Sequence, residues 1–212
     1  MNFQEILDTD IYALTDEGLS KGRSNIEVVD AMLTAGIKVL QYREKDKKSG
    51  EMLAECLKIR EMTRQAGCKF IVNDYVDIAM LCDADGVHVG QGDIPVPLVR
   101  QLVGKDKIIG LSTHTPEECK KAIELGADYI GVGPIFATKT KKDVCAPVGY
   151  EYLEYVTQNH SIPHVAIGGI KLHNIADVAQ HGARCCAIVS EIVGAEDIAG
   201  TVTALRKAMN ER

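Results

Sequence analysis

The chain has 212 residues and a formal net charge of -6, with hydrophobic and charged contents of 46% and 25% that are ordinary for a soluble globular protein. Because its lysines and arginines are scattered, nucleic acid is disfavoured as the main partner. No apolar run approaches the roughly 20 residues needed to span a bilayer, and MNFQEILDTD lacks a signal pattern, so a cytoplasmic protein without a membrane partner is expected.

Short apolar runs alternate with longer amphipathic stretches along the chain. The expected strands, rich in Val and Ile as strands buried on both faces are, cover 11–14, 39–42, 70–73, 86–89, 108–112, 129–133, 164–168 and 186–190. Helical patterns cover 25–35, 49–66, 115–125, 172–181 and 197–209. Asn25 and Ser49 are candidate N-caps, and Thr115 precedes Pro116 at a first-turn position.

A weak internal repeat links these elements. The segments TAGIKVLQYR, QAGCKFIVND, ELGADYIGVG and QHGARCCAIVS each end a helix, place glycine at a left-handed stop and start a strand. Eight such units predict an α/β fold, a closed (β/α)8 TIM barrel with eight parallel strands, and an open doubly wound sheet is the competing architecture. Since no Pro/Ser-rich linker interrupts the pattern, residues 1–212 are expected to form a single TIM-barrel domain.

The polar residues suited to chemistry follow the strands rather than precede them. In a parallel barrel the carboxyl ends of the strands form the reactive face. The fragment QYREK at 41–45 supplies an amide from Gln41 and cations from Arg43 and Lys45, which suit phosphate oxygens. A solvated charged loop explains this fragment about as well.

Two carboxylates follow neighbouring strands, Asp74 in FIVNDYVD and Asp93 in HVGQGD. Asn73 suits the edge of a heterocycle, although Asn73 or Asp74 could instead cap the next helix. Magnesium typically takes one or two carboxylates together with phosphate oxygens and waters. Two acids beside two cations therefore indicate a magnesium–diphosphate assembly.

Two further segments of the same rim suit anions. The loop GPIFATKTKKD at 133–143 alternates Thr138 and Thr140 with lysines, which favours an anion cradle over a generic lysine-rich loop. IGGI at 167–170 and VSE at 189–191 end the last two strands, where barrels commonly bind phosphate through backbone N–H groups. The glycines could instead serve only a tight bend.

The cysteines and histidines carry less information. The seven cysteines form no CxxC motif, so buried thiols in a reducing compartment are expected rather than disulfides or a zinc site. His88 lies inside an expected strand and should point into the barrel or its wall. His114 lies at the reactive rim, where an acid–base role and a structural role are equally open.

The fragments QYREK, VND, HVGQGD, GLSTH, GPIFATKTKKD, IGGI and VSEI occur in this order, each at a strand exit. Together they resemble the thiamine-phosphate synthase family from about residue 10 to residue 195. The resemblance implies a transferase of thiamine biosynthesis that joins a hydroxymethylpyrimidine diphosphate to a thiazole phosphate and releases pyrophosphate. It also implies one Mg²⁺ ion as cofactor, bound at a metal-binding site formed by Asp74 and Asp93.

The resemblance implies two substrate sites and, as partners, two phosphorylated small molecules, with a homo-oligomer left open. The pyrimidine diphosphate would be bound by Gln41, Tyr42, Arg43, Glu44, Lys45, Asn73, Ser112 and Lys141. Of these, the residues implied in catalysis are Arg43, Lys45, Lys141 and Ser112. The thiazole phosphate would be bound by Thr138, Lys139, Thr140, Gly169, Val189 and Ser190. Ala137 stands where the family often has proline, and DVCAPVG also departs from the commoner versions.

Two other functions fit parts of this pattern. A thiazole phosphate tautomerase of the same barrel family would use a rim base such as His114 and no metal. A non-catalytic sensor would bind phosphate ligands without turnover. The synthase is favoured, because neither alternative needs the combination of QYREK, Asp74 and Asp93.

Overall fold

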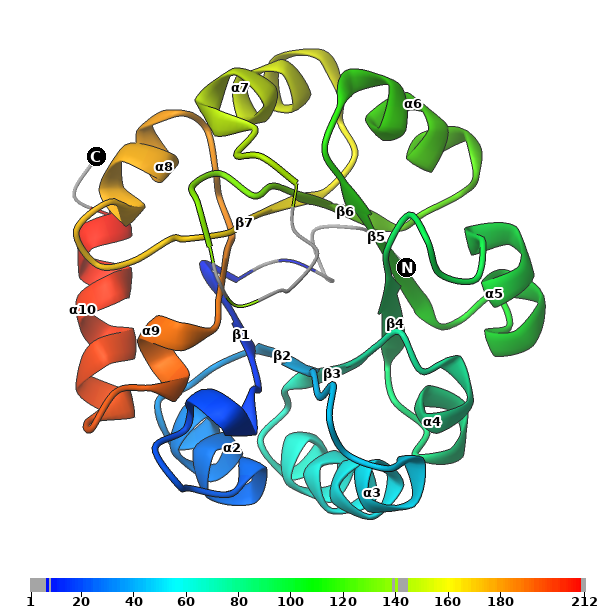
Figure 1. Cartoon of the computed structure of the whole chain (residues 1–212), viewed down its shortest axis with the longest axis vertical. Helices are drawn as coiled ribbons and strands as arrows, with labels where there is room; N and C mark the ends of the chain where they lie inside the picture. Colours follow the sequence, from blue (N-terminus) through cyan, green and yellow to red (C-terminus); the bar gives the residue numbers. More distant parts are fainter. Residues whose placement is uncertain (1–6, 8, 139, 141–144, 211–212) are drawn as a thin grey trace.

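Eight parallel strands form a closed barrel, and the helices form a ring around it (Figure 1). The structure is a computed structural model that describes residues 7, 9–138, 140 and 145–210. The strands are β1 (Ile11–Leu14), β2 (Val39–Tyr42), β3 (Lys69–Asn73), β4 (Gly86–Val89), β5 (Ile108–Thr113), β6 (Tyr129–Val132), β7 (His164–Ile167) and β8 (Cys186–Ile188). Each pairs with the next in sequence, and β8 closes on β1, with Cys186 opposite Ile11.

The prediction of an eight-stranded parallel barrel is therefore confirmed, and the open sheet is excluded. All eight expected strands are present, with ends that differ by one or two residues at most. That the whole of residues 1–212 forms one domain stays a prediction.

The helices of the described residues are η1 (Glu17–Leu19), α2 (Asn25–Thr34), α3 (Ser49–Gln65), α4 (Val76–Leu81), α5 (Val96–Val103), α6 (Pro116–Glu124), α7 (Gly149–Asn159), α8 (Ile175–Gln180), α9 (Ser190–Val193) and α10 (Ile198–Asn210). The sequence analysis does not predict α4, α5 or α7. Helix α4 has only six residues, and α5 lies next to prolines that usually mark loops. The expected helix at 172–181 is shorter, at 175–180.

The helix starts correct two predictions and confirm a third. Ser24, not Asn25, is the N-cap of α2, and its side chain forms a capping box with Glu27. Lys48, not Ser49, occupies the N-cap position of α3. Pro116 lies in the first turn of α6, as predicted, and Thr115 before it caps the helix by accepting a hydrogen bond from the backbone N–H of Glu118.

Two apolar layers result from the alternation of side chains along each strand. One set fills the barrel interior, including Tyr12, Ile71 and Tyr129. The other packs between the strands and the helices, and it includes Leu40 and Tyr42. In β2, therefore, Val39 and Gln41 face the interior while Leu40 and Tyr42 face the helices, which determines the residues of QYREK that reach the pocket.

The cysteines behave largely as expected. Six are free and buried: Cys56, Cys68, Cys82, Cys119, Cys185 and Cys186. Cys145 is exposed, which the expectation of buried thiols did not include. Within the described ranges, no helix combines the length and the apolar character required to cross a membrane.

Candidate active site

A pocket of about 380 Å³ opens at the carboxyl ends of the strands. It gathers side chains or backbone from all eight strands or their exits, which are far apart in the sequence. Of the predicted site residues, those that line it are Gln41, Arg43, Lys45, Asn73, Asp74, Asp93, Ser112, Thr138, Thr140, Gly169, Val189 and Ser190. Lys139 and Lys141 lie outside the described residues, as does Lys142.

Asp74 and Asp93 face each other at one side of this pocket. The backbone of Asp74 is in the left-handed region, with φ at 63°, and its N–H donates to the carbonyl of His88 at 2.8 Å. Burial raises the pKa of Asp74, Lys45 lowers it through an ion pair, and the charge and hydrogen bonding of Asp93 raise it again, so that the net shift is upward. Asp93 is held by the backbone N–H of Gly90, which donates to Oδ2 at 2.7 Å.

The donor set fits a hard divalent cation. Two carboxylates that repel each other in a partly desolvated pocket are stabilised by positive charge, and Lys45 supplies that charge to Asp74 here. Among the described residues, no group of three or more His, Cys, Asp or Glu side chains could enclose a metal. A two-carboxylate set completed by phosphate oxygens and water is the arrangement that Mg²⁺ prefers.

Arg43 is held by residues from two other strand exits. Its Nη1 donates to Asp16 Oδ2 at 2.9 Å, and its Nη2 donates to the carbonyl of Thr140 at 3.1 Å. The arginine side chain is only 11% exposed. Asp16 follows β1 and was missed by the sequence analysis, although its place directly after an apolar strand was the same signal used elsewhere on the rim.

Tyr42 and Glu44 do not line the pocket, although the resemblance implied that they bind the pyrimidine diphosphate. They lie on the other side of QYREK because alternate residues of an extended chain point in opposite directions. The Tyr42 hydroxyl donates to Glu55 Oε2 at 2.6 Å on α3. Glu44 Oε1 accepts from Asn25 Nδ2 and from the backbone N–H of Glu17, both at 2.9 Å.

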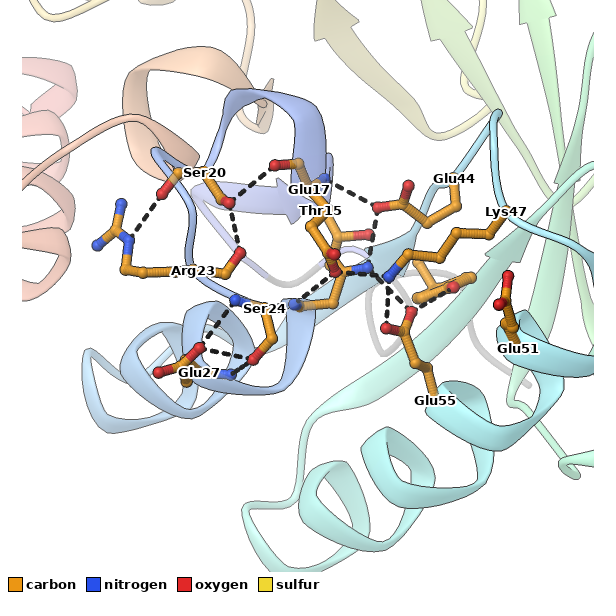
Figure 2. A network of polar contacts seen from close by, with 12 residues as sticks. Thr15, Glu17, Ser20, Arg23, Ser24, Glu27, Glu44, Lys47, Glu51 and Glu55 are labelled. Atoms are coloured by element: carbon orange, nitrogen blue, oxygen red, sulfur yellow. Dashed lines mark hydrogen bonds and ion pairs between the residues drawn. The ribbon is translucent and has the colours of Figure 1, made fainter.

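These contacts belong to a polar network in which Figure 2 labels Glu17, Glu44, Lys47 and Glu55. Lys47 pairs with both Glu17 and Glu55, and the Asn25 amide bridges Glu44 and Glu55. The network thus anchors the segment after β2 to α2 and α3. Because Tyr42 and Glu44 are anchored away from the pocket, Arg43 and Lys45 point toward it.

The network makes folding stability depend on pH through Glu55. Burial raises the pKa of Glu55, but hydrogen bonds from Lys47, Tyr42 and Asn25 outweigh burial and hold it below the ordinary value of 4.5. A carboxyl whose pKa is lower in the folded state contributes stability above its ordinary pKa and loses it as the pH falls.

We therefore expect the melting temperature of the wild type to fall more steeply below pH 4.5 than that of Glu55→Gln. At neutral pH the variant should be less stable by about 1–2 kcal/mol, because charged hydrogen bonds are lost. Glu61→Gln, an exposed change on the same helix, should follow the wild-type profile. Parallel profiles for all three proteins would contradict the assignment.

The exits of β6, β7 and β8 form the opposite side of the pocket. Thr138 and Thr140 approach each other, with their hydroxyls 3.3 Å apart. Gly169 has φ at 65°, and a Cβ there would lie 2.8 Å from the carbonyl oxygen of Ala137, so only glycine fits beside this loop. Ser190 begins α9 directly after Val189. Hydroxyls, a glycine backbone and a chain turn meet here, which suits an anion.

The two pocket histidines differ in their surroundings. His88 lies within β4 and points toward the pocket, as expected for a residue inside the barrel. His114 Nδ1 lies 2.5 Å from the carbonyl of Gly133, and because a carbonyl can only accept, Nδ1 carries a proton and donates to it. Its backbone N–H donates to Glu118.

Comparison with known proteins agrees with this geometry. A family model described as thiamine monophosphate synthase matches residues 11–192. The chain belongs to the thiamine-phosphate synthase family. A thiamine-phosphate synthase of Pelotomaculum thermopropionicum is 62% identical over 207 residues, covering 98% of this chain and 95% of that protein. One of Lawsonia intracellularis is 60% identical over 203 residues, covering 96% and 94%.

A solved structure of the family is similar throughout. The thiamine phosphate pyrophosphorylase of Pyrococcus furiosus superposes with a TM-score of 0.87 at 34% identity, covering 95% of this chain and 96% of that chain. The resemblance to the thiamine-phosphate synthase family is thus confirmed. As a family member, the chain is a transferase of thiamine biosynthesis.

Proposed function

We propose that the protein couples 4-amino-2-methyl-5-hydroxymethylpyrimidine diphosphate with 4-methyl-5-(2-phosphoethyl)thiazole. The products are thiamine phosphate and pyrophosphate, and the reaction depends on one Mg²⁺ ion. The observation that supports this most strongly is the pairing of Asp74 and Asp93 in one pocket beside Lys45 and Arg43. A pocket with both acids and cations matches a metal-bound diphosphate better than a free anion.

In this proposal Asp74 and Asp93 hold the magnesium ion, which supplies charge neutralisation to the diphosphate when bound. Arg43 offers a planar fork for phosphate oxygens, and Lys45 offers a point charge. In this arrangement both cations would lie where negative charge grows as the diphosphate departs, so they would stabilise the transition state more than the ground state. Lys141 would add a third cation.

The chemistry requires no covalent bond to the protein. The bond between the methylene carbon and the diphosphate oxygen breaks, and the electron pair leaves with pyrophosphate. The electron-rich aminopyrimidine supports the positive methylene carbon, and the thiazole nitrogen then attacks it to form the new C–N bond. The protein contributes orientation of the two substrates, which is itself a large part of many rate accelerations.

The second substrate would occupy the side of the pocket formed by the exits of β6, β7 and β8. Its phosphate group suits the Thr138 and Thr140 hydroxyls, the Ser190 hydroxyl and the backbone of Gly169 and Val189, with Lys139 as a further contact. The thiazole nitrogen would then face the methylene carbon of the pyrimidine, which it attacks. This arrangement places the two phosphorylated ends of the substrates apart from each other.

The test is to supply both substrates with Mg²⁺ and to measure thiamine phosphate and pyrophosphate together. We expect equal amounts of the two products, with loss of both when EDTA is added. The tautomerase alternative predicts a different result. The protein would act on the thiazole phosphate alone, and this activity would survive EDTA and Asp93→Ala but be lost in His114→Ala. Tight binding of thiamine phosphate without turnover would instead support a sensor.

A further inference from the structure

A chain of hydrogen bonds crosses the floor of the pocket. Gln41 Nε2 donates to the Tyr12 hydroxyl at 3.0 Å, and the hydroxyls of Tyr12 and Tyr129 lie 2.9 Å apart. The Tyr129 hydroxyl lies 2.9 Å from His88 Nδ1, and His88 Nε2 lies 2.9 Å from Ser112 Oγ. The chain therefore connects the ends of β2 and β5, which both carry predicted pyrimidine-binding residues.

The chain is buried and closely packed. Tyr12 and Tyr129 are each 1% exposed, and Gln41 is 4% exposed. A Cβ at Gly110 would lie 2.2 Å from Tyr129 Cζ and 2.4 Å from His88 Nδ1, so both rings occupy the space that this glycine leaves. Burial raises the pKa of both phenols well above the ordinary 10.0. Both hydroxyls therefore keep their protons, and each must find an acceptor.

The order of the protons along the chain follows from the Gln41 amide. Because Gln41 Nε2 donates to Tyr12, the Tyr12 proton is directed to Tyr129, the other partner of this hydroxyl within the described residues. Tyr129 then donates to His88 Nδ1, so the proton of the neutral imidazole sits on Nε2 and is donated to Ser112. With Gln41 Nε2 donating to Tyr12, the reverse order would leave the buried Tyr12 proton without an acceptor among the described residues, which folded proteins avoid.

This order determines what the two ends of the chain offer to a ligand. The Gln41 amide keeps its carbonyl oxygen as an acceptor, and the Ser112 hydroxyl keeps its proton as a donor. Both residues line the pocket. A 4-aminopyrimidine presents amine hydrogens and bare ring nitrogens, which match this pair. A 4-oxopyrimidine presents a carbonyl oxygen and a ring N–H, which reverse the pattern.

We propose that Tyr12, Tyr129 and His88 are positioning residues that make the pocket select a 4-aminopyrimidine over a 4-oxopyrimidine. They act by fixing an acceptor at Gln41 and a donor at Ser112. The inference rests on the proposed function, because it takes the pyrimidine diphosphate as the ligand of this floor. It adds a determinant of specificity in residues that the family resemblance did not assign.

The test uses Tyr129→Phe, which removes the central hydroxyl. Inhibition constants are measured for the 4-oxo diphosphate and compared with KM for the 4-amino diphosphate. We expect the wild type to prefer the amino compound by about 100-fold or more, because a polar site rejects ligands that leave its groups unpaired. In the variant the preference should fall by about tenfold. Without the Tyr129 hydroxyl, the hydrogen bond between His88 and Ser112 can change direction, so that Ser112 donates to His88 and can accept from the ligand.

Tyr152→Phe is the matched control. Tyr152 is also buried, and its hydroxyl donates to Thr113 at 2.7 Å, outside the chain. This variant should keep the wild-type preference. If Tyr129 were merely structural, Tyr129→Phe would weaken the binding of both diphosphates equally. An unchanged preference for the 4-amino compound would therefore overturn the inference. Turnover of the 4-amino compound by the wild type separates that failure from a failure of the proposed function.

A second measurement does not depend on Tyr129→Phe. Nitrogen-15 NMR of histidine-labelled protein at about pH 8, where an ordinary histidine is neutral, reports which ring nitrogen carries the proton. His88 is assigned by the signals missing from His88→Gln. We expect a protonated Nε2 and a bare Nδ1 for His88. A protonated Nδ1 would overturn the inference even if Tyr129→Phe fails to fold.

Discussion

Replacing Asp74 by asparagine is expected to reduce turnover by about 10²–10³-fold or more while the barrel stays folded. The amide keeps the size of the side chain but removes a charged oxygen ligand from the proposed magnesium site. Surface-rim substitutions usually change stability little, so the loss should appear in turnover rather than in folding. The check is steady-state pyrophosphate release at saturating Mg²⁺ beside a thermal melt.

The same substitution should make the metal-free protein more stable at neutral pH. Burial and Asp93 raise the pKa of Asp74 above its ordinary 3.8 despite the ion pair with Lys45. The folded state therefore binds the proton more tightly than the unfolded state, and stability falls as the pH rises through this window. Asp74→Asn removes that cost, so its melting temperature without metal should exceed that of the wild type.

Asp77→Asn is the matched control, because Asp77 is an exposed residue in the first turn of α4 and lies outside the pocket lining. It should retain wild-type turnover. A collapse of the melting temperature in Asp74→Asn would show instead that Asp74 is needed for the fold. Full activity in that variant would remove it from the proposed metal site.

Replacing Arg43 by lysine is expected to lower kcat/KM for the pyrimidine diphosphate by about 10²-fold although the positive charge is kept. Arg43 contacts Asp16 and the carbonyl of Thr140 with separate nitrogens, and lysine cannot hold both contacts and also offer a fork to phosphate. Asp16→Asn should have a smaller effect of about tenfold, because it loosens the guanidinium without removing it.

Both variants are measured with the diphosphate varied at saturating thiazole phosphate. Arg64→Lys serves as the control, since Arg64 is 50% exposed and pairs with Asp83 on the outer surface. If Arg43→Lys keeps wild-type kcat/KM, the planar fork has no part in diphosphate binding. If Asp16→Asn is more harmful than Arg43→Lys, Asp16 acts by some route other than Arg43.

The strands were predictable because burial on both faces leaves a simple signal. Runs such as IYAL and CAIV are apolar throughout, and a glycine stop precedes several of them. Helices α4 and α7 were missed for different physical reasons. The first is too short to show a helical period, and the second begins at Gly149 and carries several tyrosines, which are poor local signals for a helix.

The residues of the pocket rim could be predicted from the sequence wherever the end of a strand could be predicted. Asp74, Asp93 and Ser112 lie at such exits and line one pocket. Tyr42 and Glu44 show the limit of carrying over a continuous motif, because alternation turns every second side chain of QYREK away from the pocket. Tyr12 and Tyr129 look like core residues in sequence, and only the structure shows their hydroxyls meeting across the barrel.

The central claim is that Asp74 and Asp93 together hold one divalent cation that meets the diphosphate. Binding of Mn²⁺, used in place of Mg²⁺ because its free form gives an electron paramagnetic resonance signal, tests this directly in the presence of pyrophosphate. We predict one bound ion in the wild type and in Asp77→Asn, with affinity weakened about tenfold or more in Asp74→Asn and in Asp93→Asn. Equal Mn²⁺ affinity in all four proteins would contradict the account.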